Sequence, residues 1–113
     1  MCNRQKLSES FGYTESLSKL IDVLCSDFDR REGSIAEGLC SERTMVEFKY
    51  YNYKMLEGAG EIVGPELARI MISEIGHRVG YAKTKINCMS ESMYKNKKLE
   101  CKIQMAKKLH LID

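Results

Sequence analysis

The chain has 113 residues and a net charge of +2, and 43% of its residues are hydrophobic, with one proline and no tryptophan. This length predicts one domain spanning residues 1–113. The composition favours an all-α fold, a small helical bundle, and argues against a many-stranded sheet.

The first helix is predicted to follow a flexible lead-in at residues 1–13. Thr14 or Ser16 can act as its N-cap, because a side-chain oxygen accepts a hydrogen bond from an otherwise unpaired backbone N–H. Gly33 is expected to end or loosen it. The apolar residues that recur at helical spacing are Leu17, Leu20, Ile21, Leu24 and Phe28.

A second helix is predicted from the N-cap Ser41 to the glycines at Gly58 and Gly60, and it completes an N-terminal part at residues 14–64. Its aromatic residues would also suit a strand, but its length and its glycine stop favour a helix. These side chains are expected to supply core and a surface for a partner, including a homodimer. They are Phe48, Tyr50, Tyr51 and Tyr53.

A third helix is predicted from Pro65 to about Val79. Proline suits the first helical position, because its missing N–H would be unpaired there in any case. Gly80 is expected to end this helix. No glycine or proline follows Gly80, so one long helix, or two joined by a bend near Asn96, is expected to fill the remainder of the chain.

Charge is distributed unevenly between the two halves of the chain. Residues 1–65 hold 8 basic and 11 acidic side chains, whereas residues 66–113 hold 10 basic and 5 acidic ones. This asymmetry suggests that the second half meets a polyanion. A solvated basic face would account for the same distribution.

Residues 72–91 carry the pattern of a helix-turn-helix motif. Two helices that cross closely need a small residue at the crossing, which Gly76 supplies, and a turn residue that tolerates positive φ, which Gly80 supplies. Apolar side chains must flank the turn and fill the angle between the helices. The residues in these positions are Ile75, Val79, Tyr81, Ile86 and Met89. A plain helical hairpin would give a similar pattern.

The remaining positions of the second motif helix are predicted to face DNA. Lysine reaches guanine or phosphate, asparagine pairs with adenine, and threonine offers a hydroxyl and a methyl group. A long basic C-terminal helix with interleaved apolar residues follows, and its lysines would lie near phosphates or simply face solvent. The predicted DNA-binding residues are Arg78, Lys83, Thr84, Lys85, Asn87, Lys95, Lys97 and Lys98.

The stretch from Glu74 to Tyr94, with the matching residues at 74–86, resembles the helix-turn-helix of sigma-factor-like and late-gene activator proteins of phages from Gram-positive bacteria. The resemblance covers 21 of the 113 residues, and residues 1–64 match no family that we can name. It implies a phage or mobile-element protein that controls transcription at promoters. It also implies double-stranded DNA as a partner, with RNA polymerase or another host protein as a second one.

Other chemistry finds little support in the sequence. The Gly58 to Gly64 region lacks the strand context of a dinucleotide site, and His77 and Cys88 lack a third group that would orient a thiol nucleophile. No enzyme, cofactor or metal site is therefore predicted, and no membrane span. The wide spacing of the five cysteines and the polar N-terminus indicate reduced thiols in a cytoplasmic protein.

Two functional classes follow from the sequence. The first is a sequence-specific regulator of transcription that binds double-stranded DNA. The second is a small interaction protein of phage type that inhibits a host nucleic-acid enzyme by docking onto it through the basic helix or the acidic first half. Salt-dependent binding to duplex DNA distinguishes the first class from the second.

Overall fold

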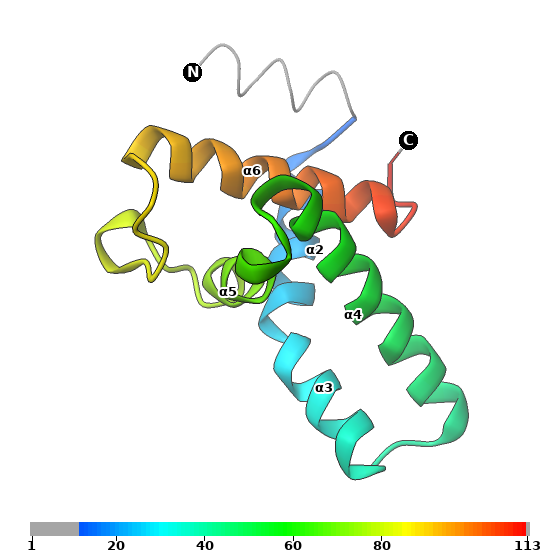
Figure 1. The fold of residues 1–113 in the computed structure, drawn as a ribbon. Helices are drawn as coiled ribbons and strands as arrows, with labels where there is room; N and C mark the ends of the chain where they lie inside the picture. Colours follow the sequence, from blue (N-terminus) through cyan, green and yellow to red (C-terminus); the bar gives the residue numbers. More distant parts are fainter. Residues whose placement is uncertain (1–11, 113) are drawn as a thin grey trace.

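The computed structural model describes residues 12–112, which fold as an all-helical assembly without strands (Figure 1). The predicted lead-in lies largely outside the described residues. None of the helices in the described range is both long and apolar enough to cross a lipid bilayer. The elements in chain order are α2 (Glu15–Ser26), α3 (Phe28–Glu37), α4 (Glu42–Val63), α5 (Pro65–Gly76), the short 3-10 helix η1 (Tyr81–Lys83) and α6 (Glu91–Lys108).

The first predicted helix is two helices. The N-cap prediction is confirmed at Thr14, whose side chain accepts a hydrogen bond from Leu17 N–H. The helix breaks at Asp27, and α3 then continues through Gly33 to a left-handed cap at Gly38. The expected stop at Gly33 is wrong, because a helix tolerates an isolated glycine at a cost of about 1 kcal/mol.

Helix α4 begins at the predicted N-cap, Ser41, but it runs past the predicted glycine stop to Val63. Tertiary packing explains the difference. A Cβ atom on Gly58 would lie 2.9 Å from the backbone N of Met105, so Gly58 allows α6 to pack directly on α4. This glycine marks a helix crossing inside α4 and not a helix end.

Helix α5 begins at Pro65, as predicted, and ends at Gly76, three residues before the predicted end. A Cβ atom on Gly76 would lie 2.6 Å from Ser26 N, so this residue must be small because α5 crosses the end of α2. The sequence correctly required a small residue at a crossing but assigned the wrong partner helix. Gly80 has φ −89°, and the left-handed turn residue is Arg78, with φ 55°.

The helix predicted directly after Gly80 is not formed. Three residues form η1, and an extended loop leads to the N-cap Ser90 of α6. The residues from Lys83 to Ser90 therefore do not make the second helix of a helix-turn-helix, because their polar groups bond to Glu74 and to one another, as described below. Helix α6 has 18 residues and includes six lysines.

The core lies where α4, α5 and α6 meet and α2 covers them. Its fully buried side chains include Met55, Met71, Ile72 and Met105. Helix α3 and the N-terminal half of α4 extend away from this body as a two-helix arm (Figure 1). A buried arginine fixes the base of the arm, since Arg31 donates to Asn52 Oδ1 at 2.7 Å and to Leu24 O at 2.6 Å.

Candidate nucleic-acid interface

The connection between α5 and α6, residues 77–90, is here called the basic loop. It carries Arg78, Lys83 and Lys85 and contains no acidic residue. All three cations are exposed, and none forms an ion pair within residues 12–112. Figure 1 shows the loop at one end of the molecule, beside the start of α6. These charges are therefore free to meet an anionic partner.

A buried carboxylate holds the basic loop in place. Glu74 is only 4% exposed, because it lies on the inner face of α5. It accepts hydrogen bonds from the Thr84 hydroxyl, from Lys85 N–H at 2.8 Å and from the Tyr94 hydroxyl at 2.8 Å. The buried carboxylate needs these donors. The chain after η1 therefore runs alongside Glu74 in an extended conformation and does not form a helix.

Electrostatics at Glu74 reflect two opposed effects. Burial raises the pKa of its carboxyl, but the hydrogen bonds from Thr84, Lys85 and Tyr94 outweigh burial and leave the pKa below its ordinary value. Burial and the neighbouring Glu74 together raise the pKa of Tyr94 to about 12. Near neutral pH the pair is thus a carboxylate and a neutral phenol, which suits the hydrogen bond between them.

A second set of bonds fastens the loop to α6. The Val79 carbonyl accepts from Lys98 Nζ at 2.6 Å and from the Tyr94 hydroxyl at 3.3 Å. The Tyr81 hydroxyl donates to Met89 O at 3.0 Å, and Ile86 is buried in the core. The backbone of the loop is irregular, but contacts with α5, α6 and the core hold it at several positions.

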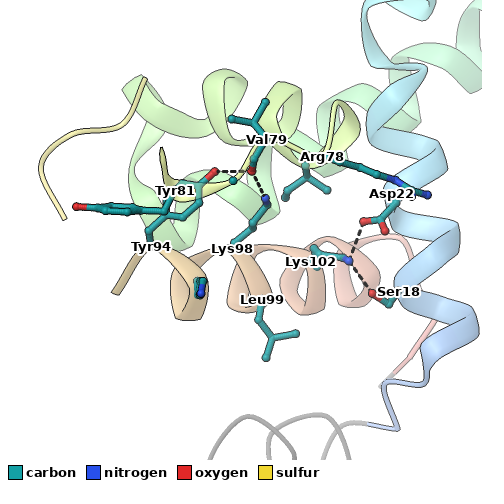
Figure 2. Close-up of a pocket in the computed structure, with 12 residues that line it drawn as sticks. Ser18, Asp22, Arg78, Val79, Tyr81, Tyr94, Lys98, Leu99 and Lys102 are labelled. Carbon is teal, nitrogen blue, oxygen red and sulfur yellow. Dashed lines mark hydrogen bonds and ion pairs between the residues drawn. The ribbon is translucent and has the colours of Figure 1, made fainter. Parts of the chain in front are cut away.

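A cleft of about 360 Å³ opens between α2, the turn at Arg78 and α6 (Figure 2). Its lining includes three apolar side chains, Ile75, Val79 and Leu99, and one carboxylate, Asp22. Four cations also line it and are here called its rim: Arg78, Lys95, Lys98 and Lys102. Two of the rim lysines are already engaged. Lys98 bonds to Val79 O, and Lys102 Nζ lies 2.7 Å from Asp22 and 2.6 Å from the Ser18 hydroxyl.

Two cations on the rim of this cleft remain accessible. Lys95 is exposed and makes only a surface ion pair with Glu91, which contributes little. Figure 2 shows the Arg78 side chain extending along the cleft toward α2. An arginine at this position is costly, because left-handed backbone disfavours residues with a Cβ by about 1 kcal/mol or more. The cap after α3 uses glycine, Gly38, for the same geometry.

A second cleft, of about 380 Å³, lies on the other side of the turn, and Val79 lines both clefts. Lys83 and Lys85 line the second cleft, together with Asp29 of α3. The basic loop thus presents Arg78 toward one side and the two lysines toward the other. Such an arrangement suits contacts with anions that are spaced along a polymer better than with a single small ion.

The predicted site residues divide into an exposed group, a group that supports the loop, and Lys97. The basic loop and the start of α6 lie at the same end of the molecule (Figure 1), and the exposed cations that they carry are Arg78, Lys83, Lys85 and Lys95. Asn87 is also exposed on the loop. Thr84 and Lys98 instead support the loop, through Glu74 and the Val79 carbonyl. Lys97 pairs with Glu100 at 3.6 Å.

Sequence reasoning missed Glu74 and Tyr94 as the residues that position the loop. A signal for Glu74 was present, because it falls between Met71 and Ile75 on the apolar face of α5. A carboxylate on such a face requires partners. Their identity could not be read from spacing, since Thr84 and Tyr94 lie ten and twenty residues away.

Comparison with known proteins identifies no relative: no protein-family model, no curated protein and no solved structure matches the chain.

Proposed function

We propose that the chain binds double-stranded DNA through the basic loop and the start of α6. The observation that carries this proposal is that the basic loop, which holds no acidic residue, lies beside the start of α6 at one end of the molecule (Figure 1). The exposed cations of these two segments are Arg78, Lys83, Lys85 and Lys95. Lysine and arginine neutralise phosphates and release counterions, which drives association with DNA.

The mode of binding differs from the insertion of a recognition helix. With a loop in place of that helix, most contacts are expected to go to the phosphate backbone, which positions a protein without reading sequence. Asn87 is the exposed loop residue suited to a base edge, because an amide pairs with adenine. A role in transcription control at phage-type promoters belongs to the same proposal, but only the sequence resemblance of residues 74–94 supports it, because the second helix of that motif is replaced by the basic loop.

The proposal is tested by fluorescence anisotropy with labelled duplex DNA. We expect the Lys83→Glu/Lys85→Glu variant to lose at least tenfold in affinity, because it replaces two attractive charges with repulsive ones. Lys19→Glu/Lys49→Glu changes the net charge equally on α2 and α4, away from the loop, and should bind almost as the parent does. Equal losses in both variants, or no binding by the parent, would refute the proposed interface.

A pool of random duplexes then tests sequence specificity. Enrichment of a defined site that Asn87→Ala abolishes would support readout by Asn87. A flat pool would indicate binding to the backbone alone and would rule out a sequence-specific regulator.

A second candidate is a docking protein that inhibits a host nucleic-acid enzyme. The observation that favours it is the apolar exposure of the arm, where Leu39 is 73% exposed and Val46 65%. Exposed apolar patches mark protein contacts. Stoichiometric binding to RNA polymerase without affinity for duplex DNA would support this candidate over the first.

A further inference from the structure

The outer face of α4 carries an aromatic stripe, defined as Val46, Tyr50 and Tyr53. Their side chains are 65%, 40% and 62% exposed, and their spacing of four and three residues puts them on one side of the helix. The opposite side of α4 faces α3, because Phe48 stacks under Arg30 and Asn52 accepts from Arg31. The stripe therefore points away from the arm's own partner helix.

No other helix in residues 12–112 covers the stripe. Helix α6 packs on the C-terminal half of α4, where Gly58 meets Met105, and the arm extends beyond it (Figure 1). Two helices alone bury little apolar surface, and tyrosine is enriched where proteins meet. The stripe has the form of half of a helix–helix interface.

We propose that a second copy of the chain covers the stripe, with the two α4 helices antiparallel. In heptad terms Tyr50 and Tyr53 occupy successive core positions, so Tyr50 of each copy packs against Tyr53 of the other. Glu47 directly follows Val46, and Lys54 directly follows Tyr53, so both charged residues lie on the same side of the stripe. Antiparallel pairing brings Glu47 of each copy to Lys54 of the other.

The charges select this direction over the parallel one. A parallel pair would set Glu42 against Glu47 and Lys49 against Lys54, which opposes like charges at every flank. In the single chain Lys54 Nζ lies 5.8 Å from the Tyr53 ring centre and 6.0 Å from that of Tyr50, at the edge of the stripe, and 3.9 Å from Glu57 Oε1 of its own helix. It is thus already placed where a carboxylate of the second copy would arrive.

The pairing is expected to be weak. The paired stripes fall at the small end of specific interfaces, below about 1,200 Å² in total, which corresponds to transient association. Two chains bound to one duplex would be held together by the DNA as well as by α4. The pairing itself does not depend on DNA binding, so the two proposals can fail separately.

Sedimentation equilibrium of the full chain, without DNA, tests the pairing over a concentration series that reaches hundreds of micromolar. We expect a monomer–dimer equilibrium that Val46→Glu/Tyr53→Glu abolishes. Val23→Glu places the same change at a 61% exposed valine of α2 and should leave the equilibrium unchanged. Circular dichroism of each variant confirms that the helices are retained.

Charge reversal gives a sharper test of direction. Glu47→Lys alone and Lys54→Glu alone should each be monomeric, because each opposes like charges at both flanks of the antiparallel pair. A mixture of the two should form a mixed dimer, since all flank pairs are then attractive. A monomeric parent, equal dimerisation of all variants, or no dimer in the mixture would overturn the proposal. A monomeric parent would leave the stripe to a different protein.

Discussion

At the scale of single residues, Glu74 is the group whose charge matters most to the interface. Its folded-state pKa lies below the ordinary value, so its ionised form stabilises the fold. This contribution is present above the unfolded-state pKa of about 4.3 and is lost as the pH falls through the folded-state value. We expect Glu74→Gln to lose about 1–3 kcal/mol at neutral pH, because an NH2 donor replaces one carboxylate oxygen and leaves at least one buried donor without an acceptor.

Urea unfolding at neutral pH and through the acid range measures both effects of Glu74→Gln. The variant should show a shallower loss of stability on acidification than the parent. Glu66→Gln is the matched control, because Glu66 is exposed at the start of α5 and has no hydrogen bond to the loop. If the parent and Glu74→Gln respond equally to acid, the carboxylate does not hold the loop.

Arg78 separates stability from binding. Its φ of 55° favours glycine, so Arg78→Gly should raise the free energy of unfolding by about 1 kcal/mol while weakening DNA binding. His110→Gly makes the same change at φ 60° after α6 and should stabilise without any effect on DNA. Unfolding curves and anisotropy on the same samples provide the comparison. A loss of stability in Arg78→Gly would show that the side chain has a structural role.

At the scale of elements, the crossing of α5 over α2 depends on one missing side chain. Gly76→Ala would bring a Cβ to 2.6 Å from Ser26 N and 2.7 Å from the carbonyl carbon of Cys25, both backbone atoms that cannot rotate away. We expect a loss of about 3 kcal/mol or more in urea unfolding. Gly33→Ala, in α3 with open space around it, should instead stabilise by about 0.5–1 kcal/mol.

The starts of α2, α4 and α5 could be predicted from the sequence, but the starts of α3 and α6, the helix ends and the packing partners could not. Thr14, Ser41 and Pro65 act on the nearest turn of backbone, so their effect is local. A glycine has the same appearance whether it ends a helix or lets another helix approach, and Gly58 and Gly76 do the latter. Only the distant contacts with α6 and α2 decide between the two.

The same distinction applies to the candidate site. Its basic residues could be predicted, because exposed charge is visible in composition. The loop that carries them could not, because the residues after Lys83 are free of glycine and proline and would suit a helix. The hydrogen bonds from Thr84 and Lys85 to the carboxylate of Glu74 outweigh the helix propensity of these residues. This is a tertiary effect, which cannot be predicted from the local sequence.

At the scale of the whole molecule, the acidic first half neutralises part of the basic second half. Lys102 pairs with Asp22, Lys108 lies 2.6 Å from Glu61, and Arg69 lies 2.6 Å from Glu32. The charge asymmetry of the sequence therefore overstates the positive surface. Three exposed cations outside this pairing, Arg78, Lys83 and Lys85, lie on the basic loop, beside Lys95 with its surface pair to Glu91. Within residues 12–112 Arg43 and Lys49 of α4 are also outside ion pairs, but they lie on the arm. The loop and the start of α6 thus give the molecule one positive end.

The division between cations held in ion pairs and accessible cations makes the salt dependence of DNA binding predictable. If Arg78, Lys83, Lys85 and Lys95 each neutralise a phosphate, the logarithm of the association constant should fall with the logarithm of salt concentration with a slope of about −3.6. Lys95→Gln should reduce the slope to about −2.7, because one contact is lost. Lys108→Gln, which removes a lysine already paired with Glu57 and Glu61, should leave the slope unchanged. Anisotropy titrations across a salt series measure all three values. If Lys108→Gln reduced the slope as much as Lys95→Gln does, the whole basic surface would contact DNA. The ion pairs of Lys108 would then not prevent this lysine from binding phosphate.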